Sequence, residues 1–251
     1  MNNQETSNPI IGSWLCSGSS VIAELMAISG YDFLAIDVEH SPVDLEKSFG
    51  LLQAIKSGNR KCRALVRVSG NSYSENKRYL DAGADGIICP MINSKEEAQL
   101  LVDSVKYPPQ GRRGVGFSRS NDYGLNLHAS FNESNKSTFV CVQIEDINAI
   151  YNLDEILSVK GIDAALIGPY DLSTSMGITG DFSHPKMTKA IEDFLIICKR
   201  NKVLPGIHQV APNPDLVKKR IKEGYKFIAY SVDITLVSSG SQKALEELRS
   251  Q

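Results

Sequence analysis

The sequence predicts an α/β fold: a (β/α)8 barrel, or TIM barrel, formed as a single domain by residues 1–251. Two observations predict it. Eight short apolar runs alternate with longer amphipathic segments, and the chain has the usual length of such a barrel. The runs do not alternate strictly with polar residues, which is typical of parallel strands covered on both faces. The predicted strands are residues 10–16, 32–39, 62–68, 86–92, 138–145, 163–168, 205–210 and 227–232.

The segments between these runs predict helices. Residues 45–55 place apolar side chains at intervals of three and four, as one face of a helix requires. Ser94 followed by Glu97 is the pattern of a capping box, and Gly224 is expected at the C-cap of a later helix. The other predicted helices are residues 96–105, 147–157, 187–198 and 216–221.

A doubly wound parallel sheet is the main alternative to the barrel. That fold would favour a glycine-rich phosphate-binding turn, GxGxxG or GxxxxGK[ST], after the first strand. The sequence there is CSGSS at 16–20, which matches neither pattern. The barrel is therefore favoured.

Residues 107–137 interrupt the alternation with two prolines, four glycines and three arginines. About 30 residues of this kind is long for a barrel connection. We expect part of the segment to be a functional loop or lid. A plain insertion with one short helix is the alternative.

The composition argues against several classes of protein. Lys plus Arg number 27 and Asp plus Glu number 29, so the chain lacks the basic excess of a nucleic-acid-binding surface. No run approaches the ~18 apolar residues of a membrane span, and the N-terminus does not resemble a secretory signal. Five widely spaced cysteines without a CxxC pair favour free thiols in a reducing cytosol over disulfides or a zinc site. We therefore expect a cytoplasmic protein with small-molecule substrates, and neither nucleic acid nor membrane as a partner.

Polar residues gather where the predicted strands end. The carboxyl ends of all barrel strands meet at one rim, where active sites lie. Charged side chains are rarely buried unless they are paired or bind a metal, so convergence at this rim predicts one polar site. The residues concerned are Asp37, Glu39, His40, Arg67, Gln143, Glu145, Asp171 and His208.

Each of these residues also has a structural interpretation. Glu145 and Asp171, from neighbouring strands, are suited to a hard divalent cation, but they could equally be solvated or ion-paired. Arg67 could bind a substrate carboxylate or oxyanion, or pair with an acid of the preceding strand. His40 and His208 could act in acid–base chemistry or simply pack. His128 and His184, in polar stretches, are expected to do no chemistry.

The lysines argue against imine chemistry. A Schiff-base aldolase needs a lysine inside the barrel mouth. Lys61, Lys202 and Lys226 all fall at the starts of predicted strands, which is the opposite end of the barrel. Lyase chemistry in this protein would therefore rely on a metal.

Several motifs, in order along nearly the whole chain, carry a family resemblance. They are DVEH at 37–40, VRV at 66–68, YPPQGRRGVG at 107–116, QIE at 143–145 and IGPYDLS at 167–173, with LDAGA at 80–84 and GSW at 12–14. Together they resemble the HpcH/HpaI family of metal-dependent class II pyruvate aldolases. The resemblance implies a (β/α)8 barrel, assembled as a homohexamer of three dimers that exchange the C-terminal helix.

The resemblance also implies roles for individual residues. Glu145 and Asp171 would hold a divalent metal (Mg2+, Mn2+ or Co2+), which binds the carboxylate and ketone oxygens of pyruvate or a related 2-oxo acid. Arg67 would face the ketone oxygen. His40 would be the base, acting through water and supported by Asp37 and Asp81. The remaining substrate-binding positions would be Gln143, Gly168, Pro169, Tyr170, Trp14 and His208.

The function implied is that of an aldehyde-lyase. It would cleave or form 4-hydroxy-2-oxo acids, giving pyruvate and an aldehyde through an enolate that the metal and Arg67 stabilise. The alternative is a biosynthetic enzyme of the citrate synthase type, which condenses oxaloacetate with an acyl donor. A non-catalytic scaffold is disfavoured because His40, Arg67, Glu145 and Asp171 are all present.

Three positions depart from the family pattern. Tyr170 stands where many members have a small residue, His208 and Gln209 replace more apolar residues, and FSRS at 117–120 differs from the degradative members. These positions are expected beside the aldehyde portion of the substrate. Polar groups there favour a hydroxylated or charged aldehyde.

Overall fold

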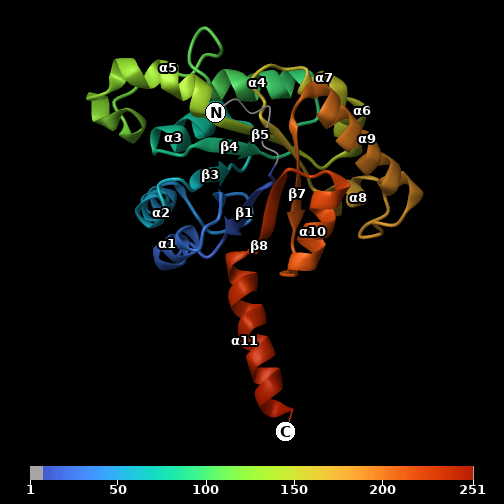
Figure 1. The fold of residues 1–251 in the computed structure, drawn as a ribbon. Helices are drawn as coiled ribbons and strands as arrows, with labels where there is room; N and C mark the ends of the chain where they lie inside the picture. The colour runs from blue at the N-terminus through green and yellow to red at the C-terminus, as the bar shows by residue number, and fades with distance from the viewer. Residues whose placement is uncertain (1–7, 251) are drawn as a thin grey trace.

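The computed structural model describes residues 8–250, which form a closed barrel of eight parallel strands in chain order (Figure 1). The barrel prediction is therefore confirmed, and each observed strand falls within its predicted run except β7, which begins one residue earlier. The strands are β1 (Ile10–Leu15), β2 (Phe33–Asp37), β3 (Arg63–Arg67), β4 (Gly86–Cys89), β5 (Phe139–Ile144), β6 (Ala164–Ile167), β7 (Leu204–Gln209) and β8 (Phe227–Val232).

Helices surround the barrel (Figure 1). They are α1 (Ser20–Ile28), α2 (Leu45–Gly58), α3 (Tyr73–Asp81), α4 (Lys95–Val105), the 3-10 helix η1 (Arg119–Gly124), α5 (Leu127–Ser137), α6 (Ile147–Tyr151), α7 (Leu153–Leu157), α8 (Pro169–Ser175), α9 (Pro185–Asn201), α10 (Pro214–Glu223) and α11 (Asp233–Arg249). The predicted capping box of Ser94 and Glu97 begins α4, and Gly224 ends α10 with a φ of 108°. Only glycine adopts that conformation without steric cost.

The strands bury both of their faces. Along β2, Phe33 and Ala35 pack with the side chains that fill the barrel interior, whereas Leu34 and Ile36 pack against the surrounding helices. Because side chains alternate along a strand, Asp37 continues the interior row and emerges at the mouth of the barrel. This geometry explains why the predicted strands read as continuous apolar runs with polar residues at their carboxyl ends.

Two helical expectations require correction. Residues 147–157 form two short helices, α6 and α7, which meet at Asn152 rather than continuing as one. The interrupted segment 107–137 contains η1 and the 11-residue helix α5, so its second half is regular structure. The polar sequence of α5 gives only a weak periodic pattern, and this explains why the apolar spacing did not reveal it.

Helix α11 projects away from the barrel (Figure 1). Its N-terminus is anchored by Asp233, whose carboxylate accepts hydrogen bonds from the backbone amides of Cys16 and Ser17 and from the Ser17 hydroxyl. The rest of the helix exposes several apolar side chains: Ile234, Val237, Leu245 and Leu248. All five cysteines are free thiols, as expected. Among the helices of residues 8–250, none combines the length and apolar character needed to cross a bilayer.

Candidate active site

The carboxyl ends of β2 and β3 bring a carboxylate and a guanidinium together inside the barrel mouth. Asp37 and Arg67 are register partners, and Arg67 donates from Nε and Nη2 to the two Asp37 oxygens at 3.0 and 2.8 Å. Burial alone would raise the pKa of Asp37, but these two bonds and two backbone amides hold it below its ordinary value. Asp37 is therefore a fixed anion that orients Arg67.

Glu39 and His40 follow at the rim. The Glu39 carboxylate lies 3.3 Å from Nη1 of Arg67 and 3.7 Å from Nε2 of His40. Burial and the nearby charge of Glu145 raise the pKa of Glu39 against the opposing effect of Arg67. The imidazole of His40 has 68% of its side chain exposed. Asp37 contacts His40 through the backbone amide, not through the ring, so Glu39 is the acid nearest to the imidazole.

Trp14 and His208 form the opposite side of the mouth. The Arg67 guanidinium lies 4.4 Å from the centre of the Trp14 ring, and this ring is 5.6 Å from that of His208 in an edge-on arrangement. Nε2 of His208 lies 3.1 Å from the carbonyl oxygen of Ser231. The Trp14 ring therefore contacts both the guanidinium and the histidine.

The end of β5 supplies Gln143 and Glu145. One Glu145 oxygen accepts a 2.8 Å hydrogen bond from the backbone amide of Met91, and the other accepts from the Gln143 side chain. Burial raises the pKa of Glu145, and the charge of Asp171 adds to the effect. Met91 has a φ of 53°, a conformation that few side chains adopt. No side-chain pattern predicts a backbone donor, so sequence reasoning missed Met91.

Asp171 lies on α8, not at the end of a strand as the sequence suggested. Helix α8 begins at Pro169, directly after β6, and places Asp171 in its first turn. Gly168 lies between the two carboxylates: a Cβ added there would be 3.2 Å from Oε2 of Glu145 and 3.8 Å from Oδ2 of Asp171. The glycine thus keeps open a space that two carboxylate oxygens border.

This arrangement fits a divalent cation. Asp37, Glu39, Glu145 and Asp171 set four carboxylates against the single guanidinium of Arg67, and the pKa values of Glu39 and Glu145 are both raised. Buried oxygens of Glu39 and Gln143 also lack hydrogen-bond partners in the described chain. No cluster of three or more metal-ligating side chains occurs within residues 8–250. A cation here would therefore complete its coordination with water or substrate oxygens.

A cavity of about 300 Å³ opens onto these groups. Arg67, Gln143, Gly168 and Asp171 line one part of it, and Trp14 and His208 line another. At the outer edge, the Tyr170 ring packs edge-on against Phe182 with centres 4.9 Å apart. Tyr170 is 58% exposed, so its ring covers the rim rather than filling the site.

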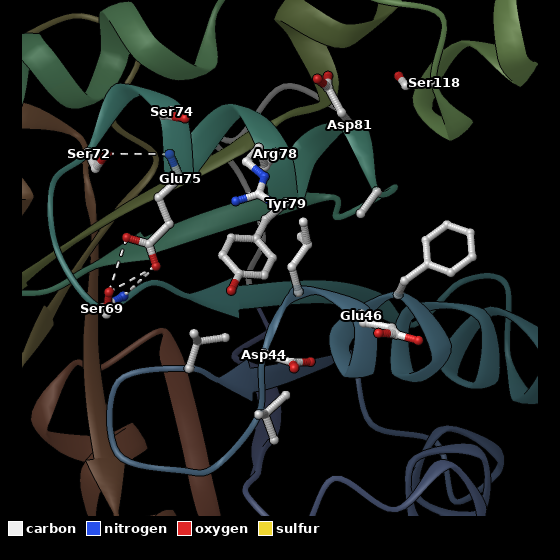
Figure 2. Close-up of a pocket in the computed structure, with 15 residues that line it drawn as sticks. Asp44, Glu46, Ser69, Ser72, Ser74, Glu75, Arg78, Tyr79, Asp81 and Ser118 are labelled. Atoms are coloured by element: carbon white, nitrogen blue, oxygen red, sulfur yellow. Dashed lines mark hydrogen bonds between the residues drawn. The ribbon is translucent and has the colours of Figure 1, made fainter.

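A larger cavity of about 1150 Å³ lies between α2 and α3 (Figure 2). Two of its acidic residues have structural partners: Asp44 caps α2, and Glu75 accepts from the amide and hydroxyl of Ser69. Asp81 lines this cavity and pairs with Arg113 at 2.7 Å. The support of His40 that the resemblance implied for Asp81 stays a prediction, because the contact seen for this carboxylate is with Arg113.

Comparison with known proteins identifies the family. The sequence profile of the HpcH/HpaI aldolase/citrate lyase family matches residues 11–240. The chain belongs to this family. A 4-hydroxy-2-oxo-heptane-1,7-dioate aldolase of Klebsiella pneumoniae is 39% identical over 93% of this chain and 87% of its own. A 2-dehydro-3,6-dideoxy-6-sulfogluconate aldolase of Pseudomonas putida is 35% identical over 95% and 92%.

The fold agrees with this family membership. The crystal structure of an HpcH/HpaI aldolase/citrate lyase family protein from Burkholderia cenocepacia superposes with a TM-score of 0.93 and 32% sequence identity, covering 99% of this chain and 97% of the other. The resemblance drawn from the motifs is therefore confirmed. The roles assigned to single residues by that resemblance remain to be tested.

Proposed function

We propose that this protein is a carbon–carbon lyase of the HpcH/HpaI family that cleaves 4-hydroxy-2-oxo acids to pyruvate and an aldehyde. The observation that carries the proposal is the placement of the Glu145 and Asp171 carboxylates around Gly168, which lines the same cavity as Arg67 and Asp171. Aldolase relatives at 35–39% identity over almost the whole chain support the same reaction class.

Glu145 and Asp171 would hold the divalent cation. Carboxylate oxygens suit Mg2+ and Mn2+, and two protein ligands leave positions for the carboxylate and ketone oxygens of a 2-oxo acid. When bound, the cation supplies Lewis-acid chemistry, which withdraws electrons from the 2-oxo group. Gln143 donates to Glu145, and its buried, unpartnered oxygen could accept a hydrogen bond from the substrate or from a water molecule.

Arg67 is positioned for the oxygen that becomes negative. In the cleavage, a base removes the proton of the 4-hydroxyl, that electron pair forms the aldehyde, and the C3–C4 bond breaks. Its electrons form the C2–C3 double bond and leave negative charge on the C2 oxygen. Asp37 and Trp14 hold the guanidinium in place before charge develops, which is the preorganisation that makes such a donor effective.

His40 is the proposed base, acting at the rim through water. Its ring is exposed, and Glu39, 3.7 Å away, is the carboxylate that can orient it. Protonation of C3 of the enolate by the same group would release pyruvate. The role of Glu39 in this step is new relative to the sequence expectation, which assigned the support to Asp37 and Asp81.

The test is release of pyruvate from 4-hydroxy-2-oxo acids by purified protein stripped with EDTA, with Mg2+, Mn2+ or Co2+ added back. We expect release to require the metal and to be lost in the Glu145→Gln, Asp171→Asn double variant. Calorimetric titration of the metal into both proteins checks the ligand assignment independently. Release that survives stripping, or equal metal affinity in the variant, would contradict the proposal.

The alternative function is that of a condensing enzyme of the citrate synthase type. Absence of pyruvate release with every metal, together with turnover of oxaloacetate and an acyl thioester, would demonstrate it. The same carboxylates and guanidinium would then act on the enolate of the acyl donor or acceptor.

We also propose that the protein assembles as a homo-oligomer through α11. The exposed apolar side chains of that helix, such as Val237 and Leu248, support the proposal because a projecting helix would otherwise leave them in water. Light scattering of the intact chain and of the Val237→Asp, Leu248→Asp variant measures the state. An unchanged mass would place the interface elsewhere.

A further inference from the structure

His208 is placed to contact the part of a substrate that becomes the aldehyde. It lies on β7, one position after Ile207, which packs toward the outer helices, so its own side chain faces the barrel interior. It lines the same cavity as Arg67 and Gly168. Trp14 contacts both residues: its ring centre lies 4.4 Å from the Arg67 guanidinium and 5.6 Å from the centre of the His208 ring. The carbon chain of a substrate that begins at the carboxylates proposed to bind the metal and passes Arg67 therefore extends toward His208.

The hydrogen bond with Ser231 fixes the tautomer of this histidine. A carbonyl oxygen only accepts, so Nε2 of His208 carries the proton and donates it to Ser231. Burial lowers the pKa of His208 to about 4, and the positive charge of Arg67 acts in the same direction. The ring is thus neutral near pH 7. A neutral ring protonated at Nε2 presents an unprotonated Nδ1, which is a hydrogen-bond acceptor.

Nδ1 is available to a ligand. Within residues 8–250 it has no hydrogen-bond partner, and the residue itself borders the cavity. The wall of the cavity combines apolar residues such as Leu166, Ile207 and Val210 with the polar residues Gln209 and Arg220. An unpaired acceptor that faces a ligand favours one that donates a hydrogen bond to it over one that leaves it unpaired.

We propose that Nδ1 of His208 accepts a hydrogen bond from a hydroxyl group on the aldehyde fragment, so that the enzyme prefers 2-hydroxyaldehydes. The corresponding cleavage substrates are 4-hydroxy-2-oxo acids that carry a second hydroxyl at C5. This inference rests on the proposed lyase function. The histidine binds the hydroxyl and does not take its proton, because a ring with this low a pKa is a weak base at neutral pH.

Glycolaldehyde and propionaldehyde form a matched pair for the test, since a hydroxyl in one replaces a methyl group of similar size in the other. The metal-loaded enzyme adds pyruvate to each aldehyde, and kcat/KM is measured for both. The two aldehydes differ in their hydration in water, so the decisive quantity is the change in the kcat/KM ratio between variants. Hydration cancels in that comparison.

We expect the ratio to favour glycolaldehyde in the wild type and to fall by about tenfold in His208→Leu, the range of one hydrogen bond to a buried acceptor. His208→Asn, whose amide oxygen can replace Nδ1 as an acceptor, should retain part of the preference. His128→Leu removes an exposed histidine of α5 and should leave the ratio unchanged. Thermal unfolding of each variant shows whether it is folded.

Several results would overturn the inference. They are a wild-type preference for propionaldehyde, an unchanged ratio in His208→Leu, or an equal loss for both aldehydes in that variant. The last would give His208 a role in the reaction common to all substrates. Failure of the lyase function itself is a different result: no product with either aldehyde, and no exchange of the methyl protons of pyruvate in D2O. Exchange without selectivity overturns only the role of His208.

Discussion

Two aspartate–arginine pairs of similar length differ in geometry: Arg67 donates two hydrogen bonds to Asp37, whereas Arg113 donates one to Asp81. Asp37 and Arg67 lie on adjacent strands inside the mouth, at 2.8 Å, and Asp81 and Arg113 lie outside the barrel, at 2.7 Å. The Arg113 guanidinium is 2% exposed and stacks 4.6 Å from the centre of the Tyr107 ring. Arg67 is 14% exposed and lines a cavity that Asp171 also lines.

The comparison shows that an ion pair does not by itself indicate a functional site. Arg113 is almost completely buried, and its pair with Asp81 fastens the segment that follows α4 to α3. Arg67 has the same anionic partner but keeps Nη1 toward Glu39 and the cavity. The open side of the guanidinium is what makes Arg67 available for an oxyanion.

The largest expected effect is on kcat, when Arg67 is replaced by lysine and compared with the same replacement of Arg113. Arg67→Lys keeps the charge but loses the planar two-point contact, so we expect kcat to fall roughly 10²–10³-fold, the cost of removing one oxyanion donor. Arg113→Lys should leave kcat per folded molecule within about twofold, because that side chain does not reach the cavity. Steady-state pyruvate release measures both. Equal losses of kcat would abolish the distinction between the two pairs.

The second effect concerns stability. Asp81→Asn leaves the buried charge of Arg113 without its partner, which we expect to reduce the free energy of unfolding by about 3 kcal/mol. Asp215→Asn is the control, since that carboxylate is exposed and pairs with the exposed Lys218, and it should cause no measurable loss. Denaturant titrations give both values.

The activity of the same Asp81→Asn protein decides whether Asp81 has a structural role or supports His40 in catalysis. A structural role predicts normal kcat for the folded fraction and a lower Tm. A fall in kcat with unchanged stability would instead restore the catalytic support of His40 that the motif resemblance implied. The structure favours the first outcome, because Asp81 contacts Arg113 rather than His40.

The sequence predicted the barrel well because two-sided burial leaves a strong signal. Each strand is a compact apolar run, and the polar residue at its carboxyl end is on the interior row, as Asp37 in β2 shows. Helix α5 was not predicted because its eleven residues are mostly polar. The break at Asn152 also escaped prediction, since the apolar spacing continues across it while the backbone does not.

The side chains of the candidate site could be named from the sequence, but the contacts between them could not. Glu145 and Asp171 are 26 residues apart, and only the closed barrel, with β5 beside β6, places both against Gly168. The amide of Met91 could not be predicted because a backbone donor has no residue type. Asp81 shows the converse problem: a residue within a family motif has a partner, Arg113, that depends on the fold of an intervening segment.

The smallest expected effect is on the pH dependence of stability, and it concerns His208 at the mouth of the barrel. The pKa of His208 falls from 6.5 to about 4 on folding, because burial and Arg67 both disfavour the charged ring. Below pH 6.5 the unfolded chain therefore binds a proton that the folded chain does not bind. The stability associated with the neutral ring is complete above this pH and is lost progressively as the pH falls toward 4.

This linkage gives a measurable difference between wild type and His208→Leu. On lowering the pH from about 7.5 to about 5, the wild type should lose about 2 kcal/mol more unfolding free energy than the variant, because the variant has no ring to titrate. Other groups, including Glu39 and Glu145, titrate in both proteins and cancel in the difference. Denaturant titrations at equal protein concentration provide the four values. An equal pH dependence in the two proteins would show that the ring titrates in the folded protein as it does in the unfolded chain, and this would contradict the burial of the ring.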